Sequence, residues 1–485
     1  MKIKTIALAT CLVMLFCLAA LAVTACDFSD LRQYYSTETF TKFDGEIERN
    51  VTIRVLENDT AISVGYFDEL LDAFNEAYAE YGITAVDANM DSYTDLALDG
   101  PFGYGPDVLY QANDVLMEFA ADKHVLPLPV EEMECYQYIP EAAWDAYEAN
   151  IEGGIYTCGV PVNIQAPMLY YRKDLLPEDW ETTYDDNANG IPDMVESWNA
   201  LYRYSQKIRS ETPDKYGYMK SLSDSYFALG YLFSYGGYVF GDNNTNARDI
   251  GIAAGQAEIG ARIIQQLASV MNMETVDDSI TLNSYSRLGD GTYFATMTTP
   301  DVYTMFIREM EADYTRRGYS ASEAAAMAEE NLVMTDVPTL PVHGDRGDED
   351  AGQMGMTVMG GVNGYAISSY TKAPKACLAF VEFATSYEMV MLRNEYLGIA
   401  PARSDVAAEL GGLSERLFEK LDAGEIVVMP SISAVGQLWD PLATMFGDIA
   451  EDAFRNEPKY PTLEALKREL QDTADGIYSA IFTLQ

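Results

Sequence analysis

The sequence predicts an α/β protein with two domains, or one large domain with more than one core. The chain has 485 residues, whereas a single domain usually takes roughly 100–200. Apolar residues make up 48% of it, which is enough to form sizeable buried cores. Strand-like and helix-like hydrophobic patterns alternate along its first third, as they do in α/β domains.

The alternation begins near Val51. Apolar residues at every second position predict strands, and apolar residues at helical spacing predict the helices between them. The helical pattern over residues 67–78 stops before Gly82, and another passes through Leu116 and Phe119. The predicted strands of this part are residues 51–55, 83–86 and 106–110.

The middle of the chain is predicted to be richer in helix. Ile252, Ile259, Ile263 and Leu267 have the spacing of one helical face. Residues 320–331 are alanine-rich and compatible with a helix. Strand-like segments recur at residues 293–298 and 356–359.

Charge and histidine content exclude several functions. Subtracting 76 acidic from 31 basic residues gives a formal net charge of −45, and such a surface repels nucleic acid and anionic lipid headgroups. His124 and His343 are the two histidines of the chain and stand far apart. This excludes an H-E-x-x-H zinc site and argues against a Ser-His-Asp triad.

The N-terminus has the pattern of an export signal. Lys2 and Lys4 precede an apolar run over residues 6–23, which fits a signal peptide or a short membrane helix. The following Leu-Ala-Val-Thr-Ala-Cys, ending at Cys26, resembles the lipobox of bacterial lipoproteins. We therefore expect residues 1–25 to be removed, Cys26 to carry lipid, and residues 26–50 to form a flexible tether. The mature protein would lie on the extracellular face of the cell membrane.

Three cysteines remain beyond the anchor: Cys135, Cys158 and Cys377. An odd number cannot form a complete disulfide framework. The sequence favours three small buried hydrophobic side chains, with a Cys135–Cys158 disulfide as the alternative.

Residues 185–196 match the D-x-[DN]-x-[DN]-G-x5-E calcium loop at every specified position. Gly190 permits the sharp turn that such a loop needs. Pro192 cannot donate a hydrogen bond to a second loop, so we expect one structural Ca²⁺ rather than a sensor. The alternative is an acidic turn that caps a helix beginning near Ser197. The predicted oxygen donors are Asp185, Asn187, Asn189, the Ile191 carbonyl, Asp193 and Glu196.

An ordered set of segments resembles the family of extracellular solute-binding proteins typified by maltose-binding protein. The segments span nearly the whole exported chain. They are residues 105–114 (GPDVLYQAND), 144–146, 154–156, 161–177 (PVNIQAPMLYYRKDLLP), 226–227, 236–238, 289–300, 399–401 and 429–439.

The resemblance implies a two-lobed periplasmic-binding-protein-like α/β fold of type II. In this fold the chain crosses between lobes at hinge segments, and ligand binds in the inter-lobe cleft. The crossings would fall near residues 161–167, 360–365 and 398–401. Lobe one would comprise residues 51–162 plus 362–397, and lobe two residues 168–358 plus 402–485.

The same resemblance implies the ligand-binding residues. Asp114 matches a carboxylate that binds sugar hydroxyls, although Asn113 or Asp114 could instead cap the next helix. Gln165 stands where maltose-binding protein has a ligand glutamate. Asp224 falls near a position where the family has an acidic partner for the ligand.

Three aromatic side chains are the predicted stacking rings. Tyr226 and Trp439 match stacking positions of the family, with ordinary packing as the alternative for each. A Gly-Pro-Trp motif common in relatives is here Thr299-Pro300-Asp301. Tyr303 is therefore predicted to replace its ring, and the role of Asp301 is open.

The function implied is capture of oligosaccharides, most simply maltooligosaccharides, for the permease subunits of an ABC importer. The protein would be a monomeric receptor that binds no nucleic acid and is not an enzyme. Alternatives are another oligosaccharide, a peptide, or a surface glycoside hydrolase with two carboxylates across the scissile bond.

Overall fold

The computed structural model describes residues 40–90, 95–151, 154–273, 276, 279–343 and 352–483. Contacts divide the chain into two units, residues 1–46 and 47–485. The predicted signal peptide, Cys26 and the tether up to residue 39 lie outside the described residues. Within residues 40–46 there is one short 3-10 helix, η1 (Phe40–Phe43). All further description concerns the unit that begins at Ile47.

The first sheet has the order β15-β14-β3-β1-β2, with β6 also paired to β14. β1, β2 and β3 are parallel, whereas β14 runs antiparallel to β3 and to β6. The first three strands confirm the strands predicted near residues 51–55, 83–86 and 106–110. Strand bounds are β1 Thr52–Leu56, β2 Thr84–Asp87, β3 Val108–Ala112, β6 Val160–Gln165, β14 Val358–Ile367 and β15 Ile426–Val428.

Helices cover this sheet, and the clearest of them in sequence is amphipathic. In α4, for example, Tyr66, Phe67, Leu70, Leu71 and Phe74 are buried, which is the apolar stripe expected from the sequence. α17 and α18 pack against α4, and the ring of Phe380 in α17 lies 5.0 Å from that of Phe74 in α4. The helices are α3 Asp59–Val64, α4 Tyr66–Ala77, α5 Leu96–Asp99, α6 Asn113–Ala121, α7 Glu141–Asp145, α17 Pro374–Ala384 and α18 Tyr387–Leu397.

The second sheet has the order β11-β7-β10-β8. The predicted strand over residues 293–298 is confirmed as β10, and the alanine-rich helix as α16. Strand bounds are β7 Met168–Arg172, β8 Tyr216–Tyr218, β10 Tyr293–Thr298 and β11 Leu332–Thr335. Its helices are α8 Trp180–Thr183, α9 Asp193–Glu196, α10 Trp198–Glu211, α11 Ser225–Phe233, α13 Ala257–Ala268, α14 Ser279–Gly289, α15 Tyr303–Arg316, α16 Ala321–Asn331, α21 Trp439–Glu451 and α22 Leu463–Thr483.

Two details of the middle region differ from the prediction. Ile252 is buried but precedes α13, which begins only at Ala257, because Gly255 takes a positive φ of 57° and turns the chain there. The strand expected at residues 356–359 starts at Val358 and continues to Ile367, and all ten of its residues are buried. The remaining strands and α-helices are β4 Glu148–Ile151, β5 Gly154–Thr157, α12 Gly241–Asn244, β9 Asn246–Ile250, β12 Leu340–Pro341, β13 Gln353–Met354, α19 Ser404–Leu410 and α20 Gly412–Asp422.

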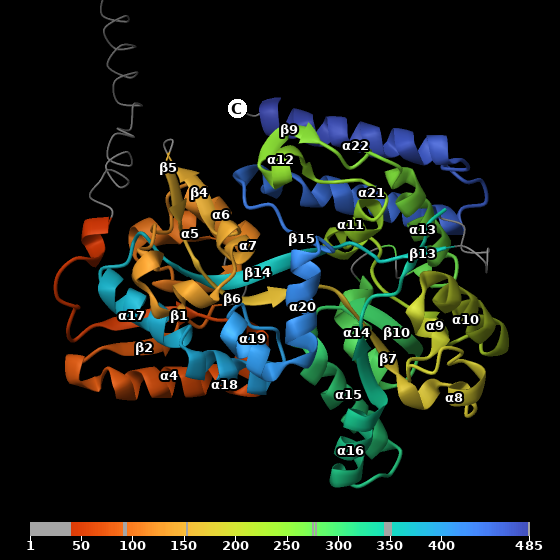
Figure 1. Cartoon of the computed structure of the whole chain (residues 1–485), viewed down its shortest axis with the longest axis horizontal. Coiled ribbons are helices and arrows are strands. Elements are labelled where there is room, and N and C mark those ends of the chain that lie inside the picture. The colour runs from red at the N-terminus through yellow and green to blue at the C-terminus, as the bar shows by residue number, and fades with distance from the viewer. Residues whose placement is uncertain are drawn as a thin grey trace, which may run out of the picture. The chain divides into compact units, whose positions relative to one another are not determined.

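The three segments predicted to cross between lobes lie side by side. Gly361 of β14 pairs with Gln165 of β6. On the other edge of β6, the Ile164 amide donates to the Ala400 carbonyl at 3.0 Å. Figure 1 shows β6 and β14 running between the helices of the first sheet and those of the second sheet. The residue limits of the two lobes stay a prediction. Arg403, which that prediction assigns to lobe two, forms an ion pair of 2.7 Å with Glu134, which it assigns to lobe one.

The cysteines beyond Cys26 are free and buried, so the alternative of a Cys135–Cys158 disulfide is wrong. Burial raises the pKa of the Cys158 thiol to about 12, as expected for a small core side chain with no charge partner. No helix among the described residues has both the length and the apolar character needed to cross a bilayer.

Candidate functional site

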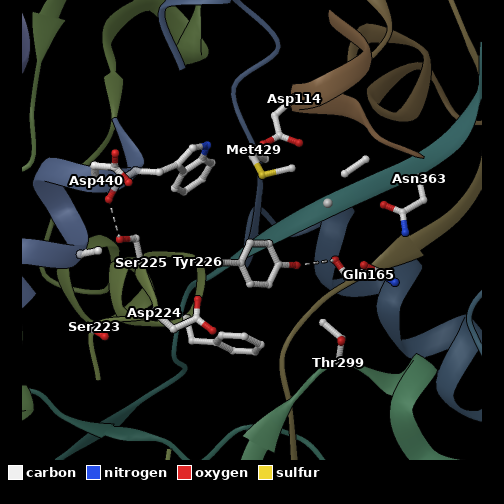
Figure 2. A pocket seen from close by; sticks show the side chains of 15 residues that line it. Asp114, Gln165, Ser223, Asp224, Ser225, Tyr226, Thr299, Asn363, Met429 and Asp440 are labelled. Atoms are coloured by element: carbon white, nitrogen blue, oxygen red, sulfur yellow. Dashed lines mark hydrogen bonds between the residues drawn. The ribbon is translucent and has the colours of Figure 1, made fainter. Parts of the chain in front are cut away.

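A cavity of about 940 Å³ lies between the helices of the first sheet and the helices of the second sheet. Its wall brings together α6 and β14 with α11 and α21, whose sequence positions are far apart. Five of the six predicted ligand residues line it, and Figure 2 shows four of them with labels. The five are Asp114, Gln165, Asp224, Tyr226 and Trp439.

Tyr303, the sixth predicted residue, is not among the residues that line this cavity. It begins α15, and its hydroxyl donates to Glu329 Oε2 of α16 at 3.2 Å. Its ring lies 6.4 Å from that of Tyr170. The contacts of Tyr303 are thus with neighbouring helices and with the second sheet.

Asp114 and Trp439 meet across the cavity. Asp114 is in the first turn of α6, and Trp439 is the first residue of α21. The backbone amides of Asp114 and Val115 and the Trp439 indole favour the ionised carboxylate and lower its pKa. Burial nevertheless raises the pKa of Asp114 above the usual range of a carboxyl group. This polar edge and the half-buried indole form one side of the cavity.

Asn113 has a structural role instead. Its amide Nδ2 donates to the Met429 carbonyl and to Ser431 Oγ, both at 3.0 Å. Its Oδ1 accepts from the Val362 amide at 3.2 Å. The N-cap of α6 is Ala112, so the alternative in which Asn113 or Asp114 is the N-cap is wrong. Asn113 fixes the start of α6 against β14.

Tyr226 lies in the first turn of α11, where its ring faces Gln165 (Figure 2). Its hydroxyl is 3.4 Å from the Gln165 carbonyl oxygen. Burial and the nearby Asp301, Asp224 and Asp114 raise its pKa, so the hydroxyl is neutral and able to donate. Asp224 is the N-cap residue of the same helix and pairs with Lys220 at 3.3 Å.

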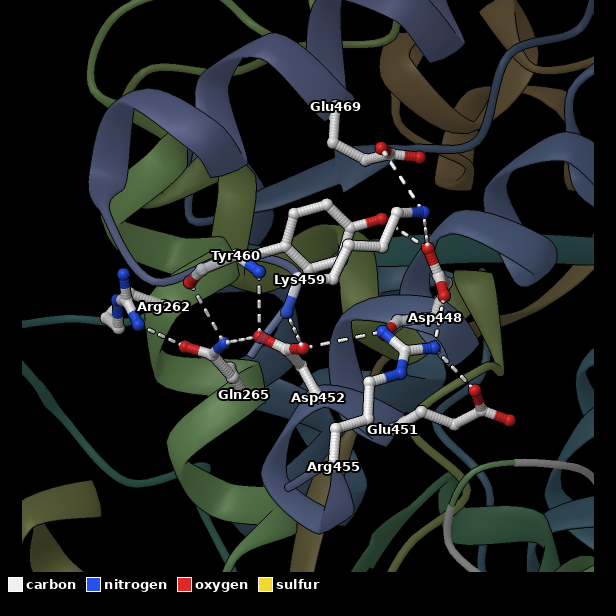
Figure 3. Close-up of polar contacts among 9 residues, drawn as sticks. All are labelled: Arg262, Gln265, Asp448, Glu451, Asp452, Arg455, Lys459, Tyr460 and Glu469. Carbon is white, nitrogen blue, oxygen red and sulfur yellow. Dashed lines mark hydrogen bonds and ion pairs between the residues drawn. The ribbon is translucent and has the colours of Figure 1, made fainter. Parts of the chain in front are cut away.

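The helix that carries Trp439 is held by a partly buried polar network (Figure 3). Asp452 follows α21 and accepts from the Tyr460 amide at 2.9 Å and from Gln265 Nε2 of α13 at 2.5 Å. Burial alone would raise the pKa of Asp448, but hydrogen bonds from Lys459, Tyr460 and Arg455 lower it to about 2. Preorganised supports of this kind keep a binding side chain in place.

Some lining residues were missed by the sequence analysis. Asn363 lies within the buried strand β14, and Asp440 follows Trp439 on α21. Asn363 is a polar residue inside an otherwise apolar run, and this pattern could have marked it as a site residue. Nothing in the sequence around Asp440 marks it in this way. Carboxylates, amides and aromatic rings together suit a neutral solute with both hydroxyl groups and apolar faces.

The predicted calcium loop folds around its own side chains. Asp185 accepts hydrogen bonds from the amides of Asn189 and Gly190, each at 3.0 Å. Gly190 takes a φ of 78°. Ser197 caps α10 with its own side chain, which accepts from the Ala200 amide at 3.2 Å. The acidic turn is therefore not needed as the cap of that helix.

The last residue of the loop closes it. Glu196 accepts from Nδ2 of Asn187 at 3.1 Å and from Nδ2 of Asn189 at 2.6 Å. Among the described residues, no three His, Cys, Asp or Glu side chains form a cluster that could hold a metal. An ion here would therefore also need the amide oxygens of the two asparagines and the Ile191 carbonyl.

Comparison with known proteins identifies relatives of the chain. The model of the family described as "Bacterial extracellular solute-binding protein" matches residues 59–391. Maltodextrin-binding protein MdxE of Bacillus subtilis is 23% identical over 359 residues, which are 73% of this chain and 75% of that protein. The maltooligosaccharide ABC transporter solute-binding lipoprotein of Streptococcus pneumoniae strain TIGR4 is 23% identical over 386 residues, 79% of this chain and 80% of its own.

Solved structures confirm the two-lobed fold. MalX of Streptococcus pneumoniae, solved in complex with maltopentaose, has a TM-score of 0.66 at 18% identity and covers 87% of this chain and 99% of its own. The maltose-binding periplasmic protein MalE of Listeria monocytogenes, solved with maltose, has a TM-score of 0.63 at 18% identity and covers 89% of this chain and 98% of its own. At these identities the likeness establishes the fold.

Proposed function

The chain belongs to the family of bacterial extracellular solute-binding proteins, and from this premise we propose that it captures maltooligosaccharides. The observation that carries the proposal is the cavity in which Asp114 and Trp439 meet, with Tyr226 and Gln165 beside them. The indole and phenol rings suit the apolar faces of glucose units, and the carboxylate and amide suit their hydroxyl groups. The names of the relatives from Bacillus and Streptococcus support this ligand class.

Delivery to an ABC importer is the second part of the proposal. The streptococcal relative is named a solute-binding lipoprotein of an ABC transporter. The segment ending at Cys26 resembles a lipobox, and lipid on this cysteine would anchor the chain to the membrane. We propose a monomeric, lipid-anchored receptor that binds sugar without covalent chemistry and passes it to permease subunits.

A galactooligosaccharide is the competing ligand. The galactooligosaccharide-binding protein of Bacillus subtilis is 30% identical over 175 residues, which are 36% of this chain and 37% of that protein. Both ligands are neutral oligosaccharides, and they differ in the orientation of hydroxyl groups that the cavity would contact.

Thermal melts of the purified protein test the proposed ligand. A ligand that binds the native state raises the melting temperature by mass action. Maltotriose and longer maltooligosaccharides are expected to raise it by about 2–5 °C at concentrations about 100-fold above the dissociation constant. Galactooligosaccharides and a peptide mixture are the comparison arms. A shift with either of these alone would overturn the maltooligosaccharide assignment, and shortened products after incubation would indicate a hydrolase.

We further propose that residues 185–196 hold a structural Ca²⁺. Support comes from the matching motif and from the turn in which Asp185 accepts the Gly190 amide. The donors would be the six predicted earlier, with the asparagine amides rotated so that their oxygens face the ion. The ion would stabilise the loop between α8 and α10 and would take no part in sugar binding.

Calcium is expected to raise the melting temperature by about 2–5 °C relative to EGTA. Glu196→Gln should abolish this shift, since it removes the charged bidentate donor. Glu178→Gln is the control, because Glu178 is exposed and lies outside the motif. Equal melting temperatures in calcium and in EGTA would refute the proposed ion.

A further inference from the structure

Two asparagines of the chain are followed directly by glycine, and the structure gives them opposite surroundings. They are Asn189 in the predicted calcium loop and Asn363 in β14. In an Asn-Gly pair the glycine nitrogen can attack the side-chain carbonyl carbon of the asparagine, since glycine has no Cβ to block the approach. This attack replaces the amide with a carboxylate, which is a covalent change of charge at one residue. Its rate in a folded chain depends on the local geometry.

The side-chain carbonyl of Asn189 is held over the next peptide. Its Oδ1 accepts a hydrogen bond from the Ile191 amide, two residues along, at 2.8 Å. The side chain is thereby folded forward across the Gly190 nitrogen. The same hydrogen bond polarises the carbonyl and is placed to stabilise the negative charge that develops on Oδ1 during an attack.

A carboxylate lies at the attacking nitrogen. The Gly190 N–H donates to Asp185 Oδ2 at 3.0 Å, a distance at which a general base takes up a proton. Asn189 and Gly190 are both exposed, so water reaches them. Apart from its chain neighbours, no atom lies within 4 Å of the place where a Cβ of Gly190 would be. Packing therefore does not oppose a rearrangement of this peptide.

Asn363 and Gly364 lie in a closed environment instead. Asn363 is buried within β14, where it pairs with Ala112 of β3 on one side and with Asn163 of β6 on the other. A Cβ on Gly364 would lie 2.4 Å from the Val160 carbonyl oxygen, so neighbouring strands enclose this peptide. In a strand the side chain also stands roughly perpendicular to the sheet and away from the next nitrogen.

From this contrast we propose that Asn189 is a site of spontaneous deamidation, with Asp185 as the general base. The Gly190 nitrogen forms a bond to Asn189 Cγ and gives its proton to Asp185. The bond from Cγ to Nδ2 then breaks, and Nδ2 takes up that proton and leaves as ammonia. Water opens the resulting cyclic imide at either of its carbonyl groups and yields aspartate or isoaspartate.

The two products change the loop in different ways. Position 189 is the fifth position of the calcium motif, which accepts aspartate as well as asparagine there. The aspartate product therefore adds a carboxylate to a loop that keeps its backbone. Isoaspartate lengthens the backbone by one carbon directly before Gly190, whose φ of 78° shapes the turn. Aged protein would contain both forms of the loop.

The test follows both asparagines in the full chain by mass spectrometry, in EGTA at mildly alkaline pH. They fall on separate tryptic peptides, since Arg203 lies between them. Each deamidation adds about 1 Da, fragmentation locates it, and enzymatic methylation specific for isoaspartate identifies that product. Asn189 is expected to react about 10-fold faster in the native chain than in guanidinium-unfolded chain. Asn363 should react more slowly in the native chain than in the unfolded one.

Asp185→Asn is expected to slow deamidation at Asn189 roughly 10-fold, because it removes the general base and keeps the shape of the side chain. Asp186→Asn is the matched control. Asp186 is exposed in the same loop, and its replacement removes the same charge without changing the acceptor of the Gly190 N–H. This variant should react at the wild-type rate.

Three results would overturn the inference. If Asn189 reacts more slowly in the native chain than in the unfolded chain, the loop protects this residue. If Asn363 reacts as fast as Asn189 in the native chain, the fold does not discriminate between the two sites. If Asp185→Asn and Asp186→Asn react at equal rates, Asp185 is not the base. The first two comparisons use wild-type protein alone, so they decide the site even where a substitution disturbs the loop.

Discussion

Replacing Arg393 with methionine is expected to lower the free energy of unfolding by about 3–5 kcal/mol. Arg393 of α18 is fully buried and pairs with Glu57, which directly follows β1. The substitution leaves the Glu57 carboxylate in the core without its cation. An uncompensated buried charge is among the largest single-residue penalties known in folded proteins.

The surroundings of the pair explain the size of the expected effect. The Tyr365 hydroxyl donates to Glu57 Oε2 at 2.6 Å. The Arg393 guanidinium lies 4.1 Å from the ring centroid of Tyr110 and 5.0 Å from that of Tyr66. The pair therefore joins β1, β3, β14 and α18, and the loss of Arg393 disturbs all four elements.

Urea unfolding of the full chain measures this effect. Lys467→Met is the control, because Lys467 forms a partly exposed ion pair with Glu258 at 3.5 Å, and such pairs contribute less than about 1 kcal/mol. The double variant Glu57→Gln with Arg393→Met should recover part of the loss, since no buried charge remains. A loss below about 1 kcal/mol in Arg393→Met would contradict the prediction.

Local patterns explain which parts of the fold could be predicted. β1 and β10 have periodicity within their own segments, and α16 begins with the capping box of Ser320 and Glu323. A strand such as β14 is different, because its partners β15, β3 and β6 come from distant parts of the sequence. Its uniform burial reflects neighbours on every side, and no local signal gives their identity.

The candidate site and the core beside it also contain residues that the sequence could reveal and residues that it could not. Asp114, Tyr226 and Trp439 were found through resemblance to a family, and the structure brings them to one cavity. Tyr303 was expected there because a ring of relatives is replaced in this chain, but its side chain contacts Glu329 instead. Glu57 and Arg393 lie 336 positions apart, and each alone looks like an ordinary surface residue in the sequence. Their pairing follows only from the folded sheet.

Trp439→Ala is expected to weaken maltotriose binding by on the order of 100-fold. The indole is half-buried and lines the cavity, so its loss removes a stacking surface and a group that favours the ionised form of Asp114. Calorimetry provides the measurement. Trp180→Ala is the matched control, since Trp180 is also half-buried but contacts Lys173 outside the cavity. A change of less than about threefold in Trp439→Ala would rule out a central role for this ring.

Asp114→Asn separates the contribution of the carboxylate from that of the ring. The folded pKa of Asp114 is raised by burial, so its ionised form costs stability at neutral pH, and this cost disappears as pH falls through the raised pKa. Without sugar, the variant should therefore melt higher than wild type at pH 7 and equally at low pH. Its affinity for maltotriose should nevertheless fall roughly 10-fold. Higher stability with lower affinity is the behaviour of a group retained for binding, whereas lower stability would show that Asp114 serves the fold through its contact with Trp439.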